Sequence, residues 1–287
     1  MLLKELRDNF QSVLKESYPE TEIQSFFNLL ADAYLGMKRI DISLNLFQSI
    51  SDQQSEKFEE ALKRLKNHEP VQYILGETEF FGLAFNVNKN TLIPRPETEE
   101  LVARILETST EASNILDIGT GSGCIAISLA KNIPGAQVYA IDVSPEALEV
   151  AKSNAGQNKV KVESLELDIL NWEQNNHQVF LDEIKFDVIV SNPPYVRTLE
   201  KSQMQANVLD FEPDLALFVS DDDPLIFYRE ISDFASQHLK TGGRLFFEIN
   251  QYLGNEMIAL MTDSGFADVT IKQDIFGNDR MISGIKK

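Results

Sequence analysis

Cysteine and histidine are scarce in this sequence. Cys124 is the only cysteine among 287 residues, so the chain cannot form an internal disulfide or a site of several thiolates. The three histidines, His68, His177 and His238, lack the close spacing that is typical of metal ligands. We therefore predict no bound metal. A chain without disulfides suits a reducing compartment, and we expect it in the cytoplasm.

Positive charge and long apolar runs are also lacking. The chain has 26 Lys and Arg residues against 45 Asp and Glu residues, a formal net charge of −19. Binding to long nucleic acids usually needs a basic surface, so the composition disfavours such a partner. No apolar stretch approaches the length of a membrane span, and the charged first residues differ from a signal peptide. We expect a globular protein of one or two domains that is not bound to a membrane.

Residues 1–72 contain only helical patterns. Apolar residues recur at spacings of three and four, which predicts amphipathic helices that pack as a small bundle. Thr21 is the expected cap of the second helix, and the third is expected to extend from Ile42 to Ile50. The apolar positions are Leu2, Leu3, Leu6, Phe10, Val13 and Leu14, then Ile23, Phe26, Phe27, Leu30 and Tyr34, then Ile42, Leu46, Phe47 and Ile50, then Phe58, Leu62 and Leu65.

The remainder of the chain predicts a hairpin followed by an α/β domain. Residues 73–90 are aromatic and interrupted by glycine, which favours a linking β-hairpin. In residues 91–287 strand and helix patterns alternate, as in a doubly wound sheet. The last two strands flank Gly277, a hairpin turn. A mostly parallel seven-stranded sheet that ends in an antiparallel hairpin is the topology of the class I S-adenosylmethionine-dependent methyltransferases. The strands are expected at residues 115–119, 137–143, 160–167, 186–191, 244–249, 269–276 and 280–285.

A glycine-rich turn follows the first strand of this domain. Glycine lets the backbone turn sharply and approach a ligand closely. The dinucleotide-binding fingerprint requires a third glycine where this chain has Cys124, so the turn fits S-adenosylmethionine better. We expect the amino-acid end of that cofactor to be held by backbone groups and an acidic residue. The residues of the turn are Gly119, Thr120, Gly121, Ser122 and Gly123.

Two carboxylates follow the next two strands. Asp142 ends the second strand, where it can accept hydrogen bonds from both ribose hydroxyls, a device that NAD enzymes share. Asp168 ends the third strand and could accept from the adenine amino group, although a single Asp there is as often a turn residue. The ends of parallel strands meet at one edge of a sheet, so we expect these residues around one site together with Asn192.

The apolar strand 186–191 stops at Asn192-Pro193-Pro194-Tyr195. Two prolines fix their own φ and donate no backbone hydrogen bond, so a stiff extended turn must follow the strand. The Asn192 side-chain oxygen and the Pro193 carbonyl can accept hydrogen bonds from the two N–H groups of a planar NH₂ group. Tyr195 can then pack on the flat face of that group. We predict that this turn binds the substrate and that Asn192 is catalytic.

These motifs resemble the PrmC/HemK family, the release factor glutamine methyltransferases. The stretches that carry the resemblance are Pro70–Gly76, Ile93–Glu99, Asp117–Gly123, Asn192–Tyr195, Phe211–Pro213, Gly242-Gly243 and Phe276–Arg280. The resemblance implies S-adenosylmethionine-dependent methylation of the side-chain nitrogen (N5) of the glutamine in the Gly-Gly-Gln loop of class 1 peptide chain release factors. It also implies that the N-terminal bundle helps to dock the release factor, and we expect a monomer.

The chain differs from the family pattern at two positions. Asn250 stands where the family often has glycine after the fifth strand. Ile169, which the resemblance places beside the adenine, replaces an aromatic side chain of some members. Three other functions stay open at this point: a ribosomal protein glutamine methyltransferase, an adenine-N6 nucleic-acid methyltransferase that flips a base into the same pocket, and a binding module without activity.

Overall fold

The computed structural model describes residues 1–109, 111, 113–174 and 184–287. His177 lies outside the described residues. The chain divides into two compact units. The first comprises Met1–Gly76 together with Gln205–Phe211, and the second comprises Glu77–Met204 and Glu212–Lys287.

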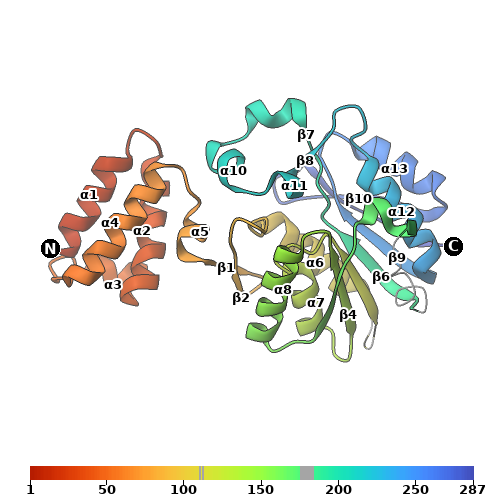
Figure 1. Cartoon of the computed structure of the whole chain (residues 1–287), viewed down its shortest axis with the longest axis horizontal. Coiled ribbons are helices and arrows are strands. Elements are labelled where there is room, and N and C mark those ends of the chain that lie inside the picture. Colours follow the sequence, from red (N-terminus) through yellow and green to blue (C-terminus); the bar gives the residue numbers. More distant parts are fainter. Residues whose placement is uncertain (110, 112, 175–183) are drawn as a thin grey trace. The chain divides into compact units, whose positions relative to one another are not determined.

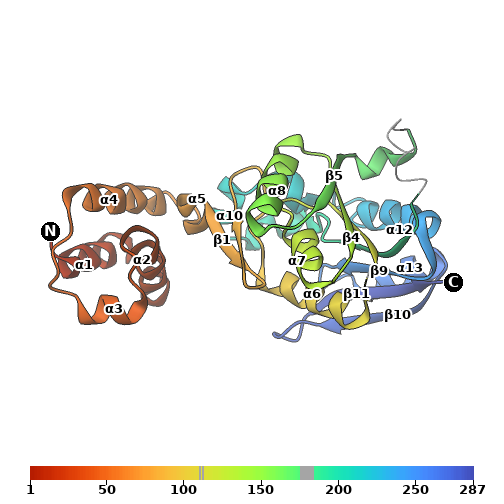
Figure 2. The ribbon, with the colours of Figure 1, turned by 90° about the horizontal axis from the view of Figure 1, so that it is seen from below.

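The first unit is helical, with elements α1 (Leu3–Leu14), α2 (Glu20–Leu35), α3 (Arg39–Leu44), α4 (Asp52–Lys66), α5 (Val71–Leu75) and α10 (Ala206–Phe211). Figure 2 shows α1 to α4 gathered into a bundle. The rings of Phe10, Phe27 and Phe58 meet there, with centroids 5.5–6.0 Å apart. The apolar stripes of α1, α2 and α4 thus form one core, as their spacing predicted.

The sequence-based boundaries were wrong at three places in this unit. Pro19, rather than Thr21, is the N-cap of α2. The third helix ends at Leu44, and Phe47, expected on its apolar stripe, is 76% exposed. Residues 71–75 form the short helix α5, although the hairpin was predicted to begin at residue 73. A helix of one turn leaves too few residues to show a period.

The hairpin begins after Gly76. Strands β1 (Glu77–Phe80) and β2 (Leu83–Asn86) pair in antiparallel register, with Phe80 opposite Leu83. Both residues of the connecting turn have positive φ, 51° at Phe81 and 71° at Gly82, as a two-residue hairpin loop with the correct twist requires. The backbone N–H of Phe81 donates to Glu99 Oε1 at 2.7 Å, and this bond helps to hold Phe81 in the strained turn.

The second unit contains a seven-stranded sheet in the order β10-β11-β9-β6-β3-β4-β5. Figure 1 labels its strands β4, β6, β9 and β10. Strands β3, β4, β5, β6 and β9 run parallel, and β11 is antiparallel to both β9 and β10, as predicted for a class I methyltransferase fold. The bounds are β3 Asn114–Ile118, β4 Gln137–Asp142, β5 Val162–Glu166, β6 Phe186–Ser191, β9 Leu239–Glu248, β10 Phe266–Gln273 and β11 Asp279–Lys286.

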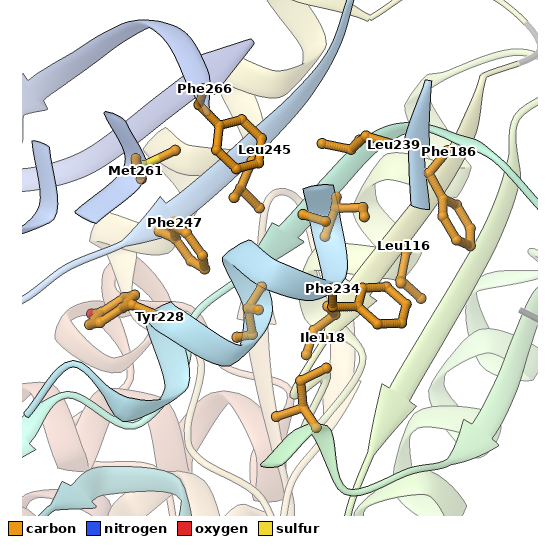
Figure 3. Packing of buried hydrophobic residues seen from close by; sticks show 14 of the residues in the cluster. Leu116, Ile118, Phe186, Tyr228, Phe234, Leu239, Leu245, Phe247, Met261 and Phe266 are labelled. Carbon is orange, nitrogen blue, oxygen red and sulfur yellow. The ribbon is translucent and has the colours of Figure 1, made fainter. Parts of the chain in front are cut away.

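Helices cover both faces of the sheet. On one face, α6 (Pro96–Thr108), α7 (Cys124–Asn132) and α8 (Pro145–Asn158) pack with Ile115 and Val190 in one apolar cluster. On the other, α12 (Ile226–His238) and α13 (Gly254–Asp263) pack against Leu116, Ile118 and Phe247 (Figure 3). Neighbouring residues of β3 therefore point to opposite faces of the sheet and pack in different apolar clusters. Both faces of β3 are thus covered by helices, and a ligand can bind at its carboxyl end.

Short elements connect strand ends to helices and were not predicted. They are η1 (Ile169–Gln174), β7 (Val196–Arg197), η2 (Thr198–Gln203), α11 (Asp214–Leu217) and β8 (Phe218–Val219). The two-residue strands β7 and β8 pair in parallel after the Asn-Pro-Pro-Tyr turn. Within the described ranges, no helix has the length and apolarity needed to cross a membrane.

Candidate active site

A cavity of about 250 Å³ opens where β3, β4, β5 and β6 end. It is lined by Gly119, Asp142, Asp168 and Asn192. Asp142 is the last residue of β4, and the other three follow the ends of β3, β5 and β6. The sequence predicted that these residues share one edge of the sheet, and the structure brings them to one cavity. Its remaining wall is mostly apolar and includes Ile118, Val143, Leu167, Phe227 and Ile231.

The three glycines of the turn after β3 divide into two roles. Gly119 and Gly121 have φ of 72° and 54° and line the cavity, and a Cβ added at either would meet no protein atom within 4 Å. Their backbone is therefore open to a ligand. Gly123, with φ of 81°, is not among the lining residues, and a Cβ there would lie 2.9 Å from Ile127 Cδ1 and 3.1 Å from the Ala151 side chain. Its lack of a side chain lets α7 pack closely on α8.

We expect Gly123→Ala to lower the free energy of unfolding by about 2–4 kcal/mol, because it adds an overpacking cost to the left-handed strain. Gly121→Ala carries only the strain and should cost about 1–2 kcal/mol. Urea denaturation of both variants measures the difference. Equal losses would show that Gly123 has no packing role.

Asp142 ties the glycine turn to the next strand. Its Oδ2 accepts from the Gly121 N–H at 2.8 Å, and its Oδ1 accepts from the Ser144 N–H at 3.0 Å. Burial raises the pKa of Asp142, and these backbone bonds partly oppose the rise. Each carboxylate oxygen accepts more than one hydrogen bond, so Asp142 keeps capacity for hydroxyl donors in the cavity.

Asp168 and Ile169 form another part of the cavity wall. Asp168 Oδ1 accepts from the Leu170 N–H at 2.9 Å, and its Oδ2 accepts from Asn171 Nδ2 at 2.7 Å. Asp168 is thus a turn residue and a lining residue at once. Ile169 lines the cavity beside it and is 8% exposed, so it offers an apolar surface for a flat ring. Thr120 and Ser122 complete the lining from the glycine turn.

Asn192 is oriented by a buried chain of polar groups. Its Nδ2 donates to Thr98 Oγ1 at 3.3 Å, and Thr98 Oγ1 donates to Glu248 Oε2 at 2.6 Å. Glu248 is 1% exposed, and burial raises the pKa of its carboxyl. Asn192, Pro193 and Pro194 all line the cavity, as a substrate-binding turn should.

Tyr195 lies elsewhere than predicted. It is not among the described residues that line the cavity, and its ring packs against the apolar cluster of α12 and α13. Its hydroxyl donates to Glu248 Oε1 at 2.9 Å. The sequence alone could not predict this, because a Tyr side chain after Asn-Pro-Pro can point either toward the cavity or toward the core. Tyr195 anchors the turn through this hydrogen bond.

Several lining residues were missed. Residues 89–92, 94 and 95 line part of the cavity, and Arg95 pairs with the buried carboxylate of Glu212. Glu212 also accepts from the Ile93 N–H at 3.1 Å and so joins two segments 119 residues apart. The Pro-rich stretch around Arg95 had a helix-start signal that explained it without a site. Thr98 and Glu248 carried no separate signal.

Family comparisons agree with this geometry. The family model described as "PrmC N-terminal domain" matches residues 5–76, and "Methyltransferase small domain" matches residues 97–210. A protein of Flavobacterium psychrophilum named release factor glutamine methyltransferase is 51% identical over 287 residues, which covers 98% of each chain. The chain belongs to the release factor glutamine methyltransferase family. The resemblance that its motifs predicted is thereby confirmed.

Other members and solved structures support the same placement. A release factor glutamine methyltransferase of Bacteroides thetaiotaomicron is 43% identical, covering 94% of this chain and 95% of its own. Among solved structures, a methyltransferase from Pyrococcus furiosus superposes with a TM-score of 0.51 at 19% identity, covering 72% of this chain and 90% of its own. The latter supports the fold alone, which is the predicted class I methyltransferase fold.

Proposed function

We propose that this member of the release factor glutamine methyltransferase family transfers a methyl group from S-adenosylmethionine to the side-chain nitrogen (N5) of the glutamine in the Gly-Gly-Gln loop of class 1 peptide chain release factors. Identity of 51% over 98% of a relative with that name carries the proposal. The cavity supports it, because its polar groups come from the ends of four strands and its glycine turn is open to a ligand.

The cavity residues fit S-adenosylmethionine. Asp142 keeps acceptor capacity for ribose hydroxyls, Asp168 for an adenine amino group, and Ile169 offers an apolar face. Gly119 and Gly121 leave room for an amino-acid end at the backbone. When bound, this cofactor supplies an electrophilic methyl group.

Catalysis by this chain depends on orientation. An amide nitrogen is a weak nucleophile because its lone pair is delocalised, and it must be aligned with the methyl group. Asn192 Oδ1 and the Pro193 carbonyl accept the two N–H bonds of the glutamine amide and hold its nitrogen toward the donor. Such alignment can contribute up to about 7–11 kcal/mol. Gly119, Asp142 and Asp168 would hold the cofactor, which would supply the methyl group and leave as S-adenosylhomocysteine. The surplus proton of the amide would pass to solvent without a dedicated base.

The helical bundle of residues 1–72 is the proposed docking module for the release factor. The match of the "PrmC N-terminal domain" to residues 5–76 supports a separate role for this unit. Its exposed apolar side chains Ile40, Leu44 and Phe47 are candidates for contact with the partner. We further propose that the protein acts as a monomer in the cytoplasm.

The decisive experiment offers several methyl acceptors to the full chain with labelled S-adenosylmethionine. We expect label on a class 1 release factor and none on its variant with the loop glutamine changed to alanine. Ribosomal proteins and an adenine-rich duplex serve as the other acceptors. Label on either of these, with none on the release factor, would refute the proposed substrate.

Asp142→Ala should weaken S-adenosylmethionine binding by about 10- to 100-fold, since hydrogen bonds to a charged group contribute about 1.5–3 kcal/mol. Isothermal titration of the full chain measures the dissociation constant. The matched control is Asp187→Ala, a carboxylate near the start of β6 that pairs with Lys240. An unchanged dissociation constant for Asp142→Ala would exclude it from cofactor binding.

A further inference from the structure

Thr98 stands between the substrate-binding turn and a buried carboxylate. It lies in the first turn of α6, is 2% exposed and lines the cavity beside Asn192. Its hydroxyl has contacts on two sides, Asn192 Nδ2 at 3.3 Å and Glu248 Oε2 at 2.6 Å. Thr98 therefore connects a residue of the cavity to one in the core.

A hydroxyl group has one hydrogen to donate, so the direction of one bond fixes the other. An ionised carboxylate only accepts, and Glu248 accepts from Thr98 at one oxygen and from Tyr195, at 2.9 Å, at the other. Burial raises the pKa of Glu248, and these two hydrogen bonds and the positive charge of Arg280 oppose the rise. Because each Glu248 oxygen accepts from a hydroxyl in the structure, the hydrogen of Thr98 is committed to Glu248, and only its lone pair remains for Asn192.

That commitment decides which end of the Asn192 carboxamide faces the cavity. The NH₂ end donates to Thr98, so the oxygen is the end left for a ligand. With the carboxamide turned over, its oxygen would face a lone pair of Thr98 and its NH₂ group would face the N–H groups of the substrate. The reversed orientation thus places two acceptors together on one side of the carboxamide and two donors together on the other.

We propose that Thr98, held by Glu248, is a positioning residue that fixes the carboxamide of Asn192 with its oxygen toward the substrate amide. The proposal rests on the proposed function for its consequence on catalysis, and on geometry alone for the orientation itself. Thr98 acts through Asn192 and does not contact the reacting atoms.

The kinetic test compares Thr98→Val, which keeps the shape and removes the hydroxyl, with Thr98→Ser, which keeps the hydroxyl. We expect Thr98→Val to lower kcat for release factor methylation at least about tenfold, with the KM for S-adenosylmethionine within about twofold, and Thr98→Ser to restore most of the rate. Thr108→Val on the same helix is the control, because in the described part of the chain its hydroxyl donates to backbone carbonyls alone.

A second comparison separates positioning from a merely structural role. In an Asn192→Ala background no carboxamide remains to be oriented, so Thr98→Val should change the residual rate by less than about twofold. A tenfold loss in that background as well would overturn the proposal. So would a Thr98→Val enzyme with the wild-type kcat.

The orientation can also be measured without any substrate. The side-chain NH₂ signal of Asn192 in the ¹⁵N-labelled full chain is assigned by its absence from Asn192→Ala. We expect hydrogen exchange at this group to be at least about fivefold faster in Thr98→Val than in the wild type or Thr98→Ser. If the wild type methylates no release factor while this difference persists, the proposed function fails and the positioning role stands. Equal exchange rates in all three proteins would refute the positioning role itself.

Discussion

Replacing Asn192 with alanine is expected to lower kcat by about 10²- to 10³-fold, because the substrate amide loses an acceptor and its alignment with the methyl donor. Asn192 follows the central strand β6 and lines the cavity between the glycine turn and the two prolines. The amide nitrogen has little intrinsic reactivity, so the loss should appear in the chemical step rather than in binding.

The measurement is single-turnover methylation of a release factor, together with titration of S-adenosylmethionine. The dissociation constant of the cofactor should stay within about threefold, which separates a failure of alignment from an empty site. Asn132→Ala is a control at the far end of α7, where the side chain donates to the Ser128 carbonyl. Near-normal turnover of Asn192→Ala would disprove the proposed mechanism.

Replacing Asp117 with asparagine is expected to stabilise the ligand-free protein above neutral pH. Asp117 is fully buried in β3, and burial raises the pKa of its carboxyl from 3.8 to about 7. Its Oδ2 accepts from Thr120 Oγ1 at 2.6 Å and from the Ala126 N–H at 3.2 Å, whereas its Oδ1 has no hydrogen-bond partner in the described part of the chain. The asparagine oxygen can keep both bonds without a buried charge.

The sign follows from the protons that each state binds. Between pH 4 and pH 7 the folded protein keeps the Asp117 proton that the unfolded chain has released, so the stability of the wild type falls as pH rises. At about 1.4 kcal/mol per pKa unit, the full difference is up to about 4 kcal/mol above pH 7. Asp117→Asn lacks this loss.

Urea denaturation of both proteins at pH 5 and pH 8 tests this expectation. The advantage of Asp117→Asn should grow by about 2–3 kcal/mol between the two pH values. The exposed Asp222→Asn serves as the control and should show no such trend. A stability difference that does not depend on pH would contradict a raised pKa at Asp117.

Much of the site could be predicted because local rules position it. Glycine is required where φ is positive, proline ends a strand, and the carboxyl ends of parallel strands meet at one edge. Gly119, Asp142, Asp168 and Asn192 each follow a strand that its apolar residues identify, and the four line one cavity. Their proximity needed no knowledge of side-chain packing.

Side-chain direction could not be predicted in the same way. Gly123 lies against Ala151 and is not among the described residues that line the cavity, and the Tyr195 hydroxyl donates to Glu248. Both outcomes depend on which atoms of distant segments fill the neighbouring space. The short helices α5 and α10 were missed for a related reason, since so few residues show no period and only packing decides their conformation.

By itself, the sequence determined the family, the order of the seven main strands along the chain, and the set of strand ends that line the cavity, because each depends on local backbone preference and apolar spacing. Only the tertiary structure decided how the Asn-Pro-Pro-Tyr turn is held. Thr98 lies 94 residues from Asn192 and 150 from Glu248, and folding alone brings the three side chains within hydrogen-bonding distance. A hydrogen bond is specified by the position of two groups in space, and no spacing along the chain encodes it.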